Sequence, residues 1–195
     1  MSMVRYQESK LLAKKPFFSF LGRKFWIYGA DGSTYFYVER KAFKLKEAIK
    51  VFSDESKSEA LLAIQARSII DISATYDVTD EKSGEKVGAL RRKGLKSILR
   101  DEWLVLDDND NEIGTIKEDS TAMALVRRFM PGGKLIPQKY VAEINGQQVA
   151  MIKQHFNPFM LKYDVDFSSD SGGMLDRRLG IAAVTMMLII EGRQQ

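Results

Sequence analysis

The chain contains no cysteine among its 195 residues. This absence excludes disulfide bonds, thiolate metal sites, thiol catalysis and lipid attachment to cysteine. The first residues also lack an apolar signal core behind their charges, so we expect no export and a cytoplasmic location, peripheral to a membrane at most. Any function must then come from the core, the turns and the charged surface.

The composition is that of a globular domain. Hydrophobic residues make up 45% of the chain and charged residues 29%, which argues against disorder. The length permits one domain, or two small ones, with an ample core. A net charge of +4 is mildly basic, and it neither demands an acidic partner nor excludes one.

The segment Leu175–Glu191 is the one around which the rest is organised. From Gly180 to Ile190 every residue except Thr185 is apolar, and these positions fall on all sides of a helix. Such a helix belongs inside a protein or a membrane, and a membrane span needs about 20 apolar residues. Asp176 is suited to cap its start. We therefore predict a helix about 24 Å long, buried in the middle of the protein.

The rest of the chain repeats a β-hairpin pattern. Strands rich in valine, isoleucine and aromatic residues flank turns rich in aspartate, asparagine and glycine, which is typical of hairpins. Five hairpins are predicted, with paired strands at 25–28 and 35–38, 49–52 and 60–64, 75–78 and 87–90, 103–106 and 113–116, and 140–144 and 149–152.

An opening strand at 17–21 and a closing strand at 160–167 bring the predicted total to twelve. Residues 1–16 are predicted to be a polar leader, and 120–130 a short amphipathic helix. Barrels of more than about eight strands leave a lumen, and a helix roughly 10 to 12 Å across suits it. The predicted fold is all-β: a single domain over 17–195, forming a twelve-stranded antiparallel closed barrel around a central hydrophobic C-terminal α-helix.

The hairpin units resemble those of the tubby C-terminal-like superfamily, in particular LURP-one-related proteins and phospholipid scramblases. The resemblance rests on strands such as 85–90 and 111–116, on the opening segment 21–28 with Asp31 and Gly32, and on 175–178 followed by the apolar helix. It implies a barrel enclosing a hydrophobic helix. Tubby-type members bind phosphoinositides through a basic surface, and scramblases are associated with bilayers and calcium. The cysteine-rich and proline-rich N-terminal segments of scramblases have no counterpart here.

Two acidic groups are candidate calcium sites. The run 107–112 has no register that places glycine at the sixth position, as a calcium loop requires, so a solvated hairpin tip is the better interpretation. Asp164 and Asp166 point to one face of a strand, with Asp170 nearby, as on any exposed strand. We predict no metal site and no cofactor.

His155 is the sole histidine. No nucleophile elbow, phosphate loop or pair of catalytic carboxylates accompanies it. The interpretation we favour is a histidine that lies on the surface or packs in a turn, and we expect that the protein is not an enzyme.

The charges of the connections suggest a polarised molecule. Turns within hairpins are rich in acidic residues, whereas the links between hairpins are rich in lysine and arginine. The preference of aspartate for tight turns explains the acidic end on its own, but not the density of basic residues at 91–96. Basic residues interleaved with leucine and isoleucine suit an anionic membrane surface.

These patterns lead to one functional hypothesis and two alternatives. We predict a non-enzymatic module that binds anionic phospholipid or phosphoinositide headgroups. The residues expected to bind lipid are Arg91, Arg92, Lys93, Lys96, Arg127 and Arg128. The alternatives are a soluble scaffold or protein-interaction domain without a lipid role, and a scramblase-like protein that moves phospholipids. No nucleic acid is expected as a partner, because the chain lacks a recognition motif for one.

Overall fold

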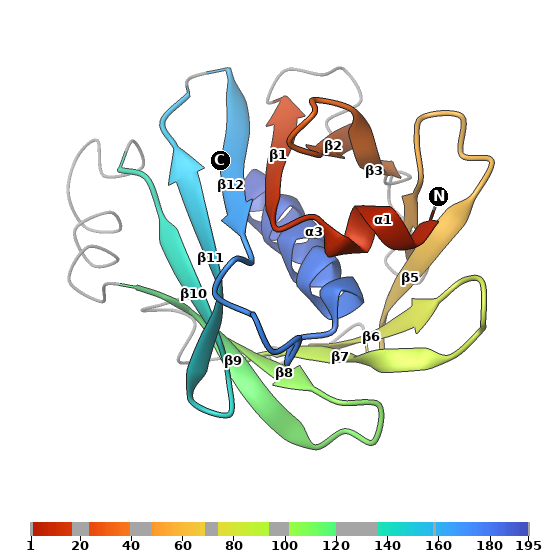
Figure 1. Cartoon of the computed structure of the whole chain (residues 1–195), viewed down its shortest axis with the longest axis vertical. Coiled ribbons are helices and arrows are strands. Elements are labelled where there is room, and N and C mark those ends of the chain that lie inside the picture. Colours follow the sequence, from red (N-terminus) through yellow and green to blue (C-terminus); the bar gives the residue numbers. More distant parts are fainter. Residues whose placement is uncertain are drawn as a thin grey trace.

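The structure, a computed structural model, describes residues 2–16, 24–39, 48–68, 74–93, 102–119, 136–157 and 159–194. Within these ranges it has twelve strands and two helices (Figure 1). Their bounds are α1 Ser2–Gln7, β1 Lys10–Pro16, β2 Lys24–Tyr28, β3 Thr34–Glu39, β4 Ile49–Phe52, β5 Ala60–Ala66, β6 Thr75–Asp80, β7 Lys86–Arg92, β8 Glu102–Leu106, β9 Glu112–Glu118, β10 Lys139–Ile144, β11 Gln147–His155, β12 Met160–Asp166 and α3 Arg177–Gln194.

The strands form one closed barrel in which neighbours in sequence are neighbours in space. All pairings are antiparallel, and the ring closes between β1 and β12. That closing ladder runs over the whole of β1, from Lys10 opposite Asp166 to Pro16 opposite Met160. A closed ring leaves no unpaired strand edge.

The core lies between the inner face of the barrel and α3, which passes through the ring of strands (Figure 1). Every residue from 179 to 189 is buried, as expected for a helix that is apolar on all sides. At the far end of α3 the buried amine of Lys15 donates a hydrogen bond of 2.8 Å to the Leu188 carbonyl. Within the described residues, no helix is both long and apolar enough to cross a membrane.

Two glycines allow α3 to approach the wall closely. A Cβ atom on Gly180 would stand 2.8 Å from the ring of Phe167. Gly88 on β7 has a φ of 153°, and a Cβ there would meet the Leu106 carbonyl oxygen at 2.4 Å and Leu179 of α3 at 3.0 Å. A side chain at Gly180 would clash with the Phe167 ring, and one at Gly88 would clash chiefly with the backbone of β8, so glycine is favoured at both positions.

The barrel has two different ends. The end formed by the turns within hairpins, which we call the turn end, also holds α1 and the start of α3. The opposite end, where successive hairpins are linked and α3 finishes, we call the link end. Much of the chain at the link end lies outside the described residues.

The predicted architecture is confirmed. The closed twelve-stranded barrel, the five hairpins, the closing strand and the C-terminal helix all occur within a few residues of their predicted bounds. Asp176 caps the helix as predicted, since its carboxylate accepts the backbone N–H of Arg178 at 2.9 Å. The helix predicted at 120–130 lies outside the described residues.

The start of the barrel was predicted wrongly. The first strand is β1, Lys10–Pro16, inside the segment expected to be a polar leader, and the strand expected at 17–21 falls outside the described residues. The inward positions of β1 are Leu11, Ala13 and Lys15. A lysine among so few apolar side chains hides the alternation by which a strand is recognised.

The segment expected to be a polar leader also contains helix α1, which was not among the predicted elements. Helix α1 lies across the turn end beside the start of α3 (Figure 1). The ring of Tyr6 packs against Phe36, with 5.3 Å between centroids, and Arg5 donates a 3.0 Å hydrogen bond to the Tyr35 carbonyl. Burial raises the pKa of Tyr6. The leader therefore belongs to the fold, covering one end of the core.

Candidate functional site

Three of the six residues predicted to bind lipid lie together at the link end of β7: Arg91, Arg92 and Lys93. The other three, Lys96, Arg127 and Arg128, fall outside the described residues.

These three cations do not share one surface. Arg92 lies on the same face of β7 as the core residue Leu90, so it is directed to the inside of the barrel, while Arg91 faces out. The amine of Lys93 lies 2.6 Å from the Glu102 carboxylate, which neutralises it. Arg91 contacts the neutral hydroxyl of Thr75, with Nε donating to Oγ1 at 3.1 Å. Of the three, Arg91 keeps its charge on the outer wall.

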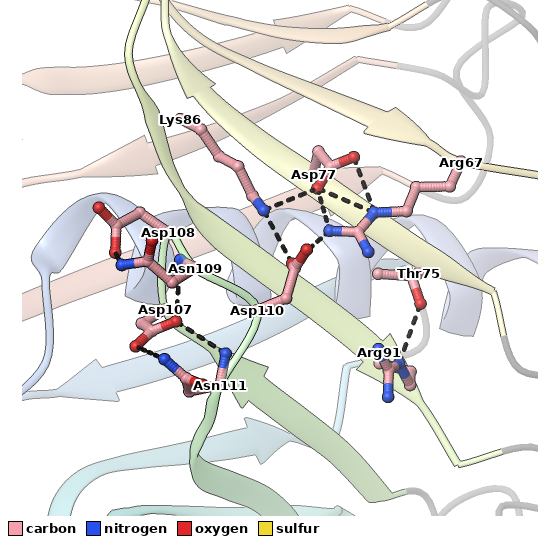
Figure 2. A network of polar contacts seen from close by, with 10 residues as sticks. All are labelled: Arg67, Thr75, Asp77, Lys86, Arg91, Asp107, Asp108, Asn109, Asp110 and Asn111. Atoms are coloured by element: carbon pink, nitrogen blue, oxygen red, sulfur yellow. Dashed lines mark hydrogen bonds and ion pairs between the residues drawn. The ribbon is translucent and has the colours of Figure 1, made fainter.

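An ion network lies on the outer wall beside Arg91. It joins Arg67, Asp77, Lys86 and Asp110, and we call it the wall network (Figure 2). Arg67 Nη2 donates to Asp77 at 2.6 Å, and its bond to Asp110 is shorter still. Lys86 Nζ reaches Asp110 at 2.8 Å. Two cations and two carboxylates thus hold the tip of the β8–β9 hairpin against β5, β6 and β7.

The wall network shows that basic and acidic residues are not fully separated between the two ends of the barrel, contrary to the prediction. Arg67 belongs to a link between hairpins and Asp110 to a hairpin turn, yet they form one cluster with Asp77. The register explains this: Asp77 lies opposite Ala89, which lies opposite Leu106, the residue just before the tip. The stagger of the strands therefore places the tip beside the middle of β6, rather than beyond its end.

The pairing changes the pKa values of Asp110 and Arg67. Hydrogen bonds from Arg67 and then Lys86 lower the pKa of Asp110 to about 2. The hydrogen bond to Asp77, followed by that to Asp110, raises the pKa of Arg67. All four side chains are about one-third exposed or more, so solvent screens their attraction and the net stabilisation is small.

The acidic residues of the turns have a conformational role. Four aspartates accept the backbone N–H two residues further on, at 2.8 to 3.0 Å, which is the hydrogen bond of an Asx turn. These residues are Asp31, Asp54, Asp80 and Asp107. Asp107 also accepts the backbone and side-chain N–H groups of Asn111, and these bonds lower its pKa. Turn geometry thus accounts for aspartate at the turn end, as the simpler explanation supposed.

The three carboxylates near the candidate calcium position each have a different hydrogen-bond partner. Asp164 meets His155 at 2.6 Å, Asp166 accepts the N–H of Ser168, and Asp170 accepts that of Met174. Among the residues that the structure describes, no three histidine, cysteine or acidic side chains are grouped so that they could hold a metal ion.

A second polar cluster, which the sequence did not reveal, surrounds the first turn of α3. It contains Asp80, Asp170, Asp176, Arg177 and Arg178, and we call it the helix-start network. Arg178 bridges the helix to the wall, at 2.7 Å from Asp176 and 3.0 Å from Asp80. Burial alone would raise the pKa of Asp80, but the bonds from Arg178 and from backbone N–H groups lower it.

Asp170 is the most enclosed member of the helix-start network. Its side chain is 0% exposed and accepts the N–H groups of Met174 at 2.7 Å and Leu175 at 3.3 Å. Arg177 lies 3.8 Å from it and stacks over the Phe167 ring, and burial lowers the pKa of this arginine. The network orients the helix as it enters the barrel. Only the capping role of Asp176 could be inferred from sequence spacing.

Comparison with known proteins identifies the family. The model of the LURP-one-related family matches residues 34–187, from the start of β3 into α3. No curated protein and no solved structure gives a significant match. Because the match covers most of the barrel and most of the central helix, the chain belongs to the LURP-one-related family, a part of the tubby-like superfamily.

Proposed function

We propose that this protein is a non-enzymatic module that binds anionic phospholipid headgroups at a membrane surface. The observation that carries the proposal is the positive charge of Arg91 on the outer wall of the barrel. Its partner is the hydroxyl of Thr75, so its positive charge is not cancelled by a carboxylate among the described residues. The aspartates of the neighbouring wall are already engaged by Arg67, Lys86 and their own turns.

Arg91 also suits a phosphate chemically. A guanidinium presents a planar set of donors that matches phosphate oxygens in pairs, and its Nε bond to Thr75 orients that plane. Each basic residue near an anionic bilayer contributes about 1 kcal/mol of attraction, so several are needed for even reversible attachment. Lys96, Arg127 and Arg128 remain predicted contributors.

The test is sedimentation with vesicles of phosphatidylcholine mixed with phosphatidylserine, or with a phosphoinositide, over a range of salt. We expect binding at low salt that fades as the Debye length falls. Arg91→Glu changes the charge by two units and should weaken binding about 30-fold. The matched control is Lys82→Glu in the β6–β7 turn at the turn end, which makes the same change in net charge.

Two results would contradict the proposal. If the unmodified protein does not bind these vesicles at low salt, the proposal fails and the protein-interaction alternative replaces it. If Lys82→Glu weakens binding as much as Arg91→Glu, attraction depends on net charge alone and no site exists at Arg91.

A further inference from the structure

Two phenylalanines are exposed where β11 connects to β12. Phe156 is 56% exposed and Phe159 is 68% exposed. Among the described residues the other large hydrophobic side chain so exposed is Val4, in α1 at the turn end. An exposed phenylalanine costs solvation free energy, and a pair on one short connection marks an interaction surface more than chance exposure does.

Side-chain hydrogen bonds lie next to both phenylalanines. The side-chain oxygen of Asn157 accepts the N–H groups of Phe159 at 2.9 Å and Met160 at 3.1 Å. Beside them, His155 Nε2 lies 2.6 Å from the Asp164 carboxylate. Phe156 therefore adjoins a paired histidine, and Phe159 takes part in a turn held by Asn157.

Lysines lie on the two strands joined by this connection and on the neighbouring strand β1. Lys14, Lys153 and Lys162 lie on the outer face of β1, β11 and β12 at the link end. Lys14 lies directly opposite Lys162 in the closing ladder, and like charges directly opposite each other destabilise a sheet. A local rule broken in this way is expected at functional sites.

The charge of these lysines is not cancelled within the part of the chain that the structure describes. Lys14 lies over the Tyr28 ring, 4.9 Å from its centroid, and neither Lys153 nor Lys162 has a carboxylate within 4.0 Å there. The nearby carboxylate, Asp164, is engaged by His155. The result is a group of three cations on the strands beside two exposed aromatic rings.

We propose that Phe156, Phe159, Lys14, Lys153 and Lys162 form the surface by which the protein docks on an anionic bilayer. This inference rests on the proposed function and deepens it. The rings enter the boundary between headgroups and acyl chains, a depth that suits aromatic side chains, while the lysine amines meet lipid phosphates and carboxylates.

A bilayer fits these observations better than other partners do. The lysines are flexible point charges spread over three strands, which suit a diffuse anionic plane. Recognition of one phosphorylated peptide favours clustered arginines instead. The surface also lies at the same barrel end as Arg91, so one membrane contact can engage both.

The first experiment places a reporter at the surface. Phe156→Trp should show a blue-shifted emission with vesicles of phosphatidylcholine and phosphatidylserine, and quenching by brominated acyl chains, above the signal of Trp26 and Trp103. Val4→Trp, equally exposed but at the turn end, is the matched control and should show neither change.

The second experiment separates the two kinds of contact by salt. Phe156→Ser with Phe159→Ser should weaken vesicle binding at least about tenfold at low and at high salt. Lys153→Gln with Lys162→Gln should weaken it about 30-fold at low salt, and this loss should shrink at high salt. Both pairs are exposed or half-buried, and an unchanged melting temperature verifies folding.

Each outcome has a separate meaning. If the unmodified protein binds vesicles but the phenylalanine and lysine pairs bind equally well, and Phe156→Trp is not quenched, this surface is overturned while lipid binding stands. If the unmodified protein does not bind at all, the proposed function and this surface fail together. Quenching of Val4→Trp instead would place the membrane at the turn end and overturn the inference.

Discussion

The wall network and the helix-start network use the same chemistry in different surroundings. Both join arginine to two aspartates at hydrogen-bonding distance. The wall network connects strands and a hairpin tip that backbone hydrogen bonds already hold together. The helix-start network connects α3 to the barrel, between which no sheet ladder exists, and it includes a carboxylate with 0% exposure.

A salt bridge contributes more to stability where few other interactions hold its two partners together. Exposed pairs contribute little because water and salt screen them. A buried carboxylate that satisfies backbone donors cannot be removed without leaving those donors unpaired. We therefore expect the helix-start network to control stability and the wall network to have a small, pH-dependent effect.

The largest effect is expected from Asp170→Ala. The change leaves the N–H groups of Met174 and Leu175 without their acceptor and Arg177 without its nearest carboxylate. We expect a loss of about 3 kcal/mol in the free energy of unfolding, or a melting temperature lower by roughly 10 °C. Urea unfolding followed by circular dichroism measures it.

Asp170→Asn is the control for that prediction, because the amide keeps an acceptor oxygen for Met174 but removes the charge. It should cost less than the alanine variant. If both variants have the same melting temperature as the unmodified protein, the Asp170 carboxylate does not hold the start of α3.

An intermediate effect is expected at Arg178. A double-mutant cycle of Arg178→Met with Asp80→Asn measures their coupling across the gap between helix and wall. Their side chains are 30% and 19% exposed, so we expect about 1 kcal/mol after allowing for solvent screening. The same cycle with Arg67→Gln and Asp77→Asn measures the wall network. Equal coupling energies in the two cycles would contradict the expected difference between the networks.

The smallest effect at neutral pH is expected from Asp110→Asn. The folded pKa of Asp110, about 2, is below its ordinary value of 3.8, so its ionised form is favoured by folding. This contribution is present above pH 3.8 and is lost as the pH falls toward 2. Melting temperatures measured across this window should fall less steeply for Asp110→Asn than for the unmodified protein. Parallel curves would show that Arg67 and Lys86 do not stabilise this carboxylate.

The sequence predicted those parts of the fold that local patterns encode. The hairpins follow from their apolar strands and Asx turns, and the helix follows from an apolar run too short to span a membrane. The first strand was missed because the burial of Lys15 depends on the Leu188 carbonyl, a partner 173 residues away. A tertiary contact of this kind leaves no trace in periodicity.

The candidate surfaces were less predictable for a related reason. The distribution of charge along the chain identified Arg91 and its neighbours as candidates. The face of the barrel on which each side chain lies is set by the alternation of β7, and the charge of Lys93 is neutralised by Glu102. The contact between Arg67 and Asp110 was not predicted, because the stagger between strands cannot be read from one hairpin. The segment 154–159 gave no reason to expect two exposed rings, since apolar residues beside strands are usually buried.

The closure of the barrel by β1 and β12 has a consequence for synthesis on the ribosome. Lys10 and Asp166 are paired although 156 residues separate them, and the helix that fills the lumen follows the last strand. A nascent chain therefore carries every hairpin before it possesses either its seam or its core. Folding that depends on such distant contacts is slow, and the half-built sheet exposes its apolar inner face meanwhile. The growing chain is thus an expected client for chaperones that shield apolar surface until the final helix emerges.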